Sequence, residues 1–397
     1  MKMVFIPLTT MVVVTPGLFI GAYERDNFGD LLFLTQTRHF MRGVDASGSS
    51  LIDSDMTGVG GEHVSAYPSL LHGARVPFVW VVGGETGGTS VTDAVAMLDH
   101  DLRGRGADSG LGLPAYASPY LPRPSRYPAL QGSASVINSV GVSGVRPLTG
   151  KHRIETIGAL REATFLSVRE AASSQVLTRL GIEHRLAPDL VHTVAKTTPL
   201  DAESDRTIAL VQAKVKHIER VGIPEFAKLL AGSGSLRPFH IRLFSAGEAP
   251  GHDSLEVLKT VAHEFRAFGG GARIDVSEAR TAHEKAAEIA SAGLWIGTSL
   301  HGYIISTSYN VPRVGLMLRK VKQYASSWDI PAPSGVPLRS LDGAIEQALE
   351  LSRTTDGDRL ALHLADRAEE NVRPRASMFS ALKSSIDGPR QSRPPRS

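Results

Sequence analysis

Gly297-Thr298-Ser299-Leu300-His301-Gly302 is a polar turn that follows the short apolar run Leu294-Trp295-Ile296. A helix-like segment comes next, and after Pro312 a second apolar run occupies residues 314–318. The lengths of the apolar runs, and the glycine and proline residues that bound them, predict a strand, a tight turn, a helix and a second strand, which together make one βαβ unit. The turn is therefore expected where the carboxyl end of a strand meets the amino end of a helix.

His301 stands in the first turn of that expected helix. Free backbone N–H groups and the helix dipole favour anions at such a place. A titratable histidine there is a candidate acid or base beside an anionic ligand. A polar helix-start residue without any chemical role produces the same local pattern, so the turn by itself fits both interpretations.

Strand-like and helical patterns alternate on both sides of this unit. The apolar run at residues 76–82 is of the kind buried in parallel sheets, and further strand-like runs occupy residues 134–140, 207–212 and 240–244. Strands that alternate with helices are typical of parallel sheets covered by helices. We therefore expect an α/β fold of two doubly wound, Rossmann-like domains that face a cleft, where ligands of such sheets bind.

The polar, irregular segment at residues 197–205 predicts the boundary between the two domains. We expect an N-terminal Rossmann-like domain at residues 1–200, a C-terminal Rossmann-like domain at residues 201–345, C-terminal helices at residues 346–384 and a disordered basic tail at residues 385–397. The stretch at residues 104–131 is rich in Gly, Pro and Tyr, and we expect it to be a long surface insertion.

The composition narrows the class of protein. Of the 397 residues, 42% are hydrophobic and 21% are charged, which is ordinary for a globular protein with a large core. There is no cysteine, which excludes disulfides, thiolate zinc sites and a cysteine nucleophile. A net charge of +3 is small for this length and does not indicate nucleic acid binding. No apolar run reaches the roughly 18 residues of a membrane span, so we expect a cytoplasmic protein.

Motifs for other chemistries are missing or weak. Neither a Gly-x-x-x-x-Gly-Lys phosphate loop nor a His-Glu-x-x-His pair occurs. The turn at residues 297–302 is not a Gly-x-Ser-x-Gly nucleophile elbow, because His301 stands at the second glycine position. Asp53-Ser54-Asp55 could hold carboxylates near a metal-bound diphosphate, but such triplets are common by chance. We predict no metal site.

Two loops after expected strands are suited to ligands. In Asn27-Phe28-Gly29-Asp30, Gly29 allows close backbone approach, and Asp30 is suited either to cap the next helix or to bind a hydroxyl. The glycine-rich turn at residues 83–88 suits a ligand that lies against the backbone. A tight strand–helix connection explains the same glycines.

Ser167-Val168-Arg169-Glu170 has the spacing of a capping box, with Ser167 as the N-cap of a helix. Arg169 would then occupy the second helical position, where the helix dipole disfavours a cation. An anion held by the guanidinium and backbone N–H groups explains this placement. An ion pair with Glu162 or Asp189 explains it equally well.

Taken in order, these motifs resemble the polysaccharide pyruvyl transferase family over residues 17–330. The resemblance lies in Asn-x-Gly-Asp at 27–30, an apolar strand ending in glycines at 79–84, Ser-Val-Arg-Glu at 167–170 with Leu-Gly-Ile at 180–182 and Pro-Asp-Leu-Val at 188–191, and Leu-His-Gly at 300–302 with Pro312 and Lys320 or Lys322. Each motif is short, but the order and spacing of all four are fairly specific.

The resemblance implies a GT-B-like fold and a transferase without a cofactor. Its donor substrate would be phosphoenolpyruvate, whose pyruvyl group forms a cyclic ketal with two hydroxyls of a sugar in a polysaccharide or its precursor, with release of phosphate. His301 carries over as the general acid, and Asp30 is our suggestion for the base. The acceptor would lie on the N-terminal domain and phosphoenolpyruvate on the C-terminal one, with these residues in contact with substrates: Asn27, Gly29, Gly83, Gly84, Arg169, Ser299, Leu300, Gly302, Lys320 and Lys322.

One position departs from the family pattern. Many members have Arg two residues before the histidine, where this chain has Ser299. Serine can cap the helix or bind phosphate, but it cannot neutralise charge. We expect one of the following cations to compensate: Arg313, Arg319, Lys320 or Lys322.

Two other functions suit the same fold. One is a GT-B-type glycosyltransferase that uses a nucleotide sugar, and the other is a glycan-binding relative without catalytic activity. A lipid-linked saccharide acceptor would bring the protein to the inner membrane face, where the basic residues between Arg373 and Arg396 would attract anionic lipids.

Overall fold

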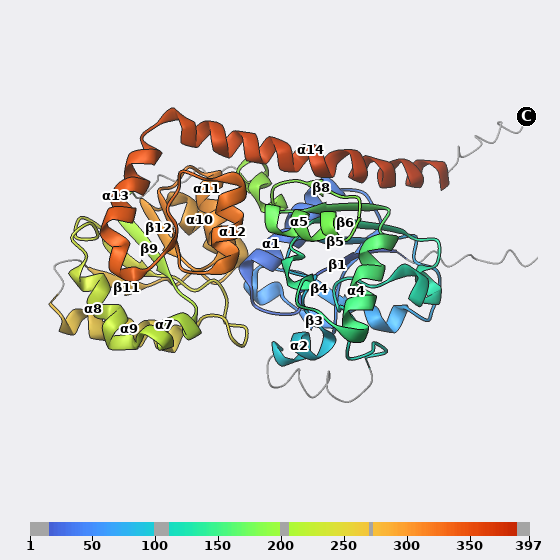
Figure 1. Ribbon diagram of the computed structural model, residues 1–397, viewed down its shortest axis with the longest axis horizontal. Helices are drawn as coiled ribbons and strands as arrows, with labels where there is room; N and C mark the ends of the chain where they lie inside the picture. Colours follow the sequence, from blue (N-terminus) through green and yellow to red (C-terminus); the bar gives the residue numbers. More distant parts are fainter. Residues whose placement is uncertain (1–15, 99–110, 199–205, 270–272, 387–397) are drawn as a thin grey trace, which may run out of the picture.

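The computed structural model describes residues 16–98, 111–198, 206–269 and 273–386. These residues form two α/β units, each built on its own sheet, and a long C-terminal helix runs along both (Figure 1). Almost all of the expected basic tail lies outside the described residues. None of the described helices is both long and apolar enough to span a membrane.

The N-terminal sheet contains eight described strands in the order β3-β4-β2-β1-β5-β6-β7-β8, and β3 alone pairs antiparallel. The strands are β1 (Gly17–Ile20), β2 (Ala46–Ser50), β3 (Ser54–Asp55), β4 (His63–Ala66), β5 (Phe78–Val82), β6 (Ala134–Val140), β7 (Phe165–Val168) and β8 (Arg185–Leu186). The helices are α1 (Phe28–Phe40), α2 (Val91–Ala96), α4 (Gly150–Glu162), α5 (Ala171–Arg179) and α6 (Val194–Thr197).

The C-terminal sheet is parallel in the order β11-β10-β9-β12-β13-β14. Its strands are β9 (Ile208–Gln212), β10 (His240–Leu243), β11 (Ile274–Val276), β12 (Leu294–Gly297), β13 (Arg313–Leu316) and β14 (Ser334–Val336). The helices are α7 (Val215–Val221), α8 (Ile223–Gly232), α9 (Leu255–Ala267), α10 (Ala282–Ser291), α11 (Leu300–Ser308), α12 (Arg319–Trp328), α13 (Leu341–Ser352) and α14 (Thr355–Ile386).

Both sheets are Rossmann-like in strand order, because the chain leaves the first strand to one side and then returns to the other. The direction reverses between β1 and β5 in the N-terminal sheet and between β9 and β12 in the C-terminal sheet. A crevice forms at the carboxyl ends of the strands at such a reversal. The loops after these four strands are therefore the places where the fold itself predicts a site.

Apolar residues place these strands in the core. All five residues of β5 are buried, as the run at residues 76–82 predicts. The βαβ unit expected around the turn at residues 297–302 is confirmed, since β12, α11 and β13 follow one another and β12 pairs with β13 in parallel. Every residue of α11 is buried. The helix is therefore held in place by the core around it.

The C-terminal helix α14 ties the C-terminal end of the chain to the N-terminal sheet. It follows α13 of the C-terminal domain and then crosses to the other domain (Figure 1). Phe379 packs on Phe78 of β5 with ring centroids 4.4 Å apart. Asn371 Nδ2 donates to Asn138 Oδ1 at 2.6 Å and to Ser167 Oγ at 2.9 Å. These contacts restrain how far the two domains move apart.

Two local predictions are wrong. Ser167 is a strand residue of β7, and Glu170 is the N-cap of α5, so the capping box does not form and Arg169 precedes the helix. Residues 165–168 pair with β6 and β8 in the sheet, and this pairing overrides the helix preference of the local sequence. In the expected surface insertion, part of the described segment is packed in the core, since Tyr120 and Leu130 are fully or almost fully buried. Residues 104–110 lie outside the described residues.

Candidate active site between the two domains

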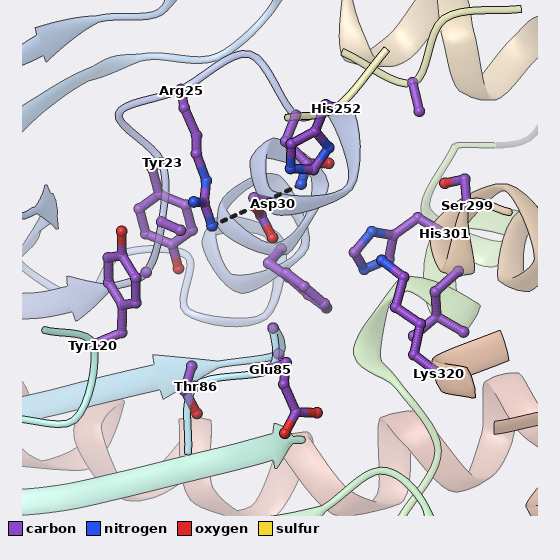
Figure 2. A pocket seen from close by; sticks show the side chains of 18 of the residues that line it. Tyr23, Arg25, Asp30, Glu85, Thr86, Tyr120, His252, Ser299, His301 and Lys320 are labelled. Atoms are coloured by element: carbon purple, nitrogen blue, oxygen red, sulfur yellow. Dashed lines mark hydrogen bonds and ion pairs between the residues drawn. The ribbon is translucent and has the colours of Figure 1, made fainter. Parts of the chain in front are cut away.

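A cavity of about 240 Å³ lies between the two domains, at the ends of β1, β5, β9, β12 and β13. Figure 2 shows Tyr23, Thr86 and Tyr120 at one end of it and Ser299, His301 and Lys320 at the other. Asp30 and Glu85 lie between the two ends. The cavity therefore has an end from the N-terminal domain and an end from the C-terminal domain.

The turn at the start of α11 is held by hydrogen bonds from both sides. Ser299 is the N-cap, and its Oγ accepts from Gly302 N at 3.2 Å. Gln212 Oε1, at the end of β9, accepts from Thr298 N at 2.9 Å and from Ser299 N at 2.7 Å. The substitution of serine at the family's arginine position thus gives a helix cap that faces the cavity.

His301 projects from this turn into the cavity and is only 8% exposed. Its ring lies edge-on to Phe33, with centroids 4.9 Å apart, and a Cβ at position 29 would come within 1.7 Å of Nδ1. Gly29 is therefore required by His301 itself, rather than by a ligand. Within the described part of the chain, His301 Nε2 is buried and has no hydrogen-bond partner.

Burial, reinforced by Arg169, Lys320 and His252, holds the pKa of His301 well below its usual range. The free protein therefore carries a neutral imidazole at neutral pH. An anion placed among these cations would favour the protonated ring. His301 is thus suited to become an acid when an anionic ligand binds beside it.

Two lysines bring positive charge to the same end of the cavity. Burial, together with Lys214 and Arg169, lowers the pKa of Lys320 to about 7. Burial also lowers the pKa of Lys214, which lies just beyond β9 and lines the cavity. Each ammonium is poorly solvated there, so an anion would stabilise its charged form.

The other expected compensating cations lie elsewhere. Lys322 is exposed, and its side chain runs along Gly335 outside this cavity. Arg313 pairs with Asp329 at 2.7 Å in a buried part of the C-terminal domain. Arg319 is exposed on the same outer surface as Lys322. Of the four candidates, Lys320 is the one that lines the cavity.

Arg169 lines the cavity, and its guanidinium also contacts two carboxylates of the protein. Nη1 donates to Asp189 Oδ2 at 3.0 Å, so the ion pair expected as an alternative does form. Nε lies 3.4 Å from Glu170 Oε2, as an ion pair without hydrogen-bond geometry. The other suggested partner, Glu162, instead pairs with Arg123.

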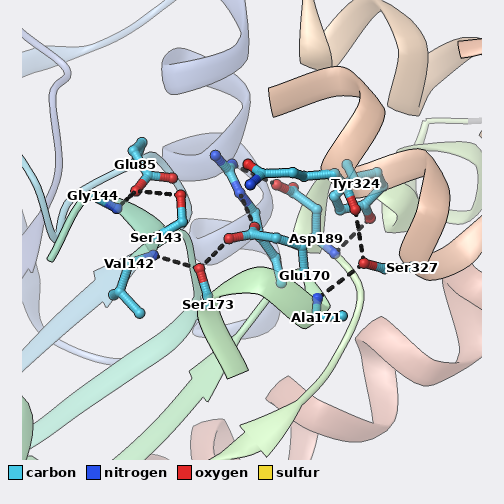
Figure 3. A network of polar contacts seen from close by, with 12 residues as sticks. Glu85, Val142, Ser143, Gly144, Glu170, Ala171, Ser173, Asp189, Tyr324 and Ser327 are labelled. Carbon is cyan, nitrogen blue, oxygen red and sulfur yellow. Dashed lines mark hydrogen bonds and ion pairs between the residues drawn. The ribbon is translucent and has the colours of Figure 1, made fainter. Parts of the chain in front are cut away.

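Helix α12 of the C-terminal domain fixes the loop that carries Arg169 (Figure 3). Trp328 Nε1 donates to Arg169 O at 2.6 Å, and Ala171 N donates to Ser327 Oγ at 2.9 Å. Asp189 N donates to Tyr324 Oη at 3.0 Å. Since Lys320 lies in the first turn of the same helix, α12 sets the position of Arg169 relative to Lys320.

Asp30 is not the cap of α1, because Asn27 takes that place and accepts from Gly29 N. Asp30 Oδ2 accepts from Asn27 Nδ2 at 2.8 Å and lies 3.5 Å from Arg25 Nη2. Burial raises the pKa of Asp30, and Arg25, the larger of the opposing charges, lowers it. A carboxyl of this kind, which faces the cavity, is suited to accept a proton from a hydroxyl.

The expected glycines divide between the cavity and the core. Gly83 and Gly84 line the cavity, with φ of 59° and 73°, in the left-handed region that favours glycine. Leu300 also lines it. Gly302 does not, because a Cβ there would meet Trp295 at 2.0 Å. No group of three or more His, Asp or Glu side chains suited to a metal occurs among the described residues.

Several lining residues escaped the sequence analysis: Tyr23, Arg25, Thr86, Tyr120, Lys214 and His252. Three of these, Tyr23, Thr86 and Lys214, stand within four residues of the end of β1, β5 or β9, so the strand-reversal rule would have found them once strand order was known. Tyr120 comes from the stretch expected on the surface, and His252 from a loop with no strand-end signal.

Solved structures with low sequence identity share this fold. A Listeria monocytogenes protein assigned as a UDP-N-acetylglucosamine 2-epimerase is 11% identical, with 95% of this chain and 97% of that chain covered and a TM-score of 0.55. The corresponding epimerases of Neisseria meningitidis and Methanocaldococcus jannaschii are 10% and 12% identical, with 93% and 88% of this chain and 99% and 98% of those chains covered, at TM-scores of 0.52 and 0.53. The expected fold of two Rossmann-like domains in a GT-B-like arrangement is confirmed.

A search of curated protein sequences found no match. The family model for polysaccharide pyruvyl transferase matches residues 27–318, which include the strand reversal between β9 and β12 and all the motifs of the resemblance up to the Leu-His-Gly turn. The chain therefore belongs to the polysaccharide pyruvyl transferase family.

Proposed function

We propose that this protein transfers the pyruvyl group of phosphoenolpyruvate to two hydroxyls of a sugar in a polysaccharide or its precursor. The observation that carries the proposal is the convergence of Lys214, Lys320, Arg169 and the amino end of α11 on His301 in one small cavity. A compact anion that carries both a phosphate and a carboxylate suits such an arrangement. We infer that the reaction occurs in the cytoplasm.

The chemistry divides between an acid and a base. His301 donates a proton to the methylene carbon of phosphoenolpyruvate, and a sugar hydroxyl attacks the neighbouring carbon as Asp30 takes its proton. A second hydroxyl then attacks that carbon while the bond to the phosphate oxygen breaks, and its proton leaves with the phosphate. The products are a cyclic ketal with a new methyl group and hydrogen phosphate. The proton that Asp30 took replaces, through solvent, the proton that His301 gave, so the protons of the two hydroxyls balance the reaction.

The charges in the cavity support this order of events. The imidazole of His301 is neutral in the free protein, because burial and neighbouring cations lower its pKa. The phosphate and carboxylate of the donor would counter those cations and favour a protonated ring. Binding of the donor would thus create the acid that the first step needs.

The test is phosphate release from phosphoenolpyruvate in the presence of methyl β-galactoside, methyl α-mannoside and N-acetylhexosamine glycosides, with product masses measured in parallel. Acceptor-dependent phosphate together with the mass of a pyruvyl ketal supports the proposal. Binding of a UDP-sugar, with no binding of phosphoenolpyruvate in the same titration, would replace it with a nucleotide-sugar glycosyltransferase. Glycan binding without any turnover would indicate a non-catalytic relative.

A further inference from the structure

Several polar side-chain atoms at the cavity are buried without a hydrogen-bond partner in the described part of the chain. They are Tyr23 Oη, Arg25 Nε, Thr86 Oγ1, Arg169 Nε and His301 Nε2, and all five residues line this one cavity. Buried polar atoms are nearly always hydrogen-bonded in native proteins. Their gathering at one cavity indicates that a ligand supplies the partners.

Tyr23 and Thr86 are built into the N-terminal end with little freedom to turn elsewhere. Tyr23 is 0% exposed, and a Cβ at Gly21 would come within 2.4 Å of its ring. Thr86 is 4% exposed, and its backbone N–H donates to Gly141 O at 3.0 Å, so its backbone is satisfied while its hydroxyl is not. Both hydroxyls are therefore held beside the cavity by the fold.

The neighbouring Tyr120 differs, because its hydroxyl is already hydrogen-bonded within the protein. Its Oη donates to Glu24 Oε1 at 2.5 Å, and the guanidinium of Arg25 lies 6.0 Å from its ring centroid. Tyr120 thus contributes its ring to this end of the cavity, while its hydroxyl is used by the protein (Figure 2). The unused hydroxyls of Tyr23 and Thr86 are distinct from it in this respect.

The charge at this end differs from that at the His301 end. Arg25, the cation here, is paired with Asp30 at 3.5 Å, and the carboxyl of Glu24 is buried close by. A hydroxyl of Tyr or Thr can donate and accept at once, as a sugar hydroxyl does. The end near Tyr23 therefore suits a neutral polyhydroxylated ligand, whereas the end near Lys320 suits an anion.

We propose that Tyr23 and Thr86 form the acceptor subsite, in which their two hydroxyls hydrogen-bond neighbouring hydroxyls of a pyranose and present them toward Asp30. This inference rests on the proposed function for the identity of the acceptor as a diol. It assigns the recognition of that diol to the loops after β1 and β5. Asp30 stands between this subsite and His301, where the attacking hydroxyl would meet the donor (Figure 2).

The test uses Tyr23→Phe and Thr86→Val, which remove one hydroxyl each with little change of shape. Binding of the same methyl glycosides is measured by saturation-transfer NMR, and binding of phosphoenolpyruvate by calorimetry, on the full-length protein. We expect at least one glycoside to bind the wild type and its dissociation constant to rise about 5- to 20-fold in each variant. The dissociation constant of phosphoenolpyruvate should be unchanged.

A second readout does not depend on any ligand. Removal of a hydroxyl without a partner should leave the melting temperature unchanged or higher. Tyr67→Phe is the matched control, because Tyr67 Oη donates to Pro119 O outside the cavity, and its loss should lower the melting temperature without affecting glycoside binding.

The inference is overturned if no glycoside binds the wild type, if both variants bind glycosides as the wild type does, or if they melt several degrees lower as Tyr67→Phe does. Glycoside binding that depends on Tyr23 and Thr86, in a protein that does not bind phosphoenolpyruvate, would keep the subsite and refute the proposed donor. The two proposals therefore fail in different ways.

Discussion

Arg169 and Tyr23 both lie just beyond parallel strands of the N-terminal sheet and both line the cavity, but their surroundings use them differently. The Arg169 guanidinium forms ion pairs with Asp189 and Glu170, and helix α12 hydrogen-bonds the backbone at Arg169 O and Ala171 N. Tyr23 Oη is buried with no partner in the described part of the chain.

The contrast separates two uses of polar groups at one cavity. A group whose partners belong to the protein contributes to stability and position, and its removal leaves a buried partner unsatisfied. A group without partners contributes nothing to stability through its polar atom and is free to bind a ligand. His301 belongs to the second kind through Nε2, although its ring is packed as tightly as a core residue.

The largest effect is expected at His301. His301→Asn removes the proposed acid while it keeps a polar side chain of similar size, so kcat should fall about 10²- to 10⁴-fold. The protein should still unfold cooperatively, with a melting temperature lowered only by the lost ring contact with Phe33, because Nε2 makes no hydrogen bond within the described structure. Steady-state phosphate release and thermal unfolding measure both. Activity close to that of the wild type would remove His301 from the mechanism.

A change at Asp189 tests whether the ion pair with Arg169 contributes to stability. Asp189→Ala leaves the buried guanidinium of Arg169 with one weaker partner, so stability should fall by about 3–5 kcal/mol. Denaturant unfolding measures this. Glu162→Ala is the control, since Glu162 pairs with Arg123 in a partly exposed position and its loss should cost about 1 kcal/mol or less. Equal losses in the two variants would contradict the structural role given to the Asp189 pair.

Ser327 tests whether α12 positions Arg169. Ser327→Ala removes the acceptor of Ala171 N, which should cost about 1 kcal/mol and raise the KM for phosphoenolpyruvate a few-fold at unchanged kcat. The effect should be smaller when Ser327→Ala is added to Arg169→Lys, because both changes act through one guanidinium. Additive effects in this double-mutant cycle would show that Ser327 acts independently of Arg169.

The smallest effect is expected at Lys322. Lys322→Ala should change the KM for phosphoenolpyruvate and the stability within error, because this side chain is exposed outside the cavity. Lys320→Ala, two residues away on the same helix, should raise that KM substantially. A larger effect at Lys322 than at Lys320 would mean that Lys322, and not Lys320, supplies the positive charge that Ser299 lacks.

Patterns that depend on local periodicity were predictable from the sequence. The βαβ unit around His301 and the buried strand β5 follow from apolar runs, and the site lies at strand ends because parallel sheets place it there. Ser299, Leu300 and His301 were found because they interrupt such a pattern.

Features that depend on contacts across the chain were not predictable. Ser167 and Glu170 carry a local helix signal that pairing with β6 and β8 overrides. The roles of Lys320 and Lys322 differ by their direction on α12, which is set by packing on the sheet. Tyr120 lies in a loop-like sequence and is buried by distant partners, including Glu24.

Calorimetric titration of phosphoenolpyruvate into the wild type between pH 7 and 8, in buffers of different ionisation enthalpy, tests the central claim most directly. In the free protein the pKa of Lys320 is about 7 and the pKa of His301 is well below its usual range. The bound anion would raise both pKa values. The account predicts net proton uptake, with affinity greatest near pH 7 and weaker by up to about tenfold at pH 8. A donor that does not bind, or binds without proton uptake at both pH values, would contradict it.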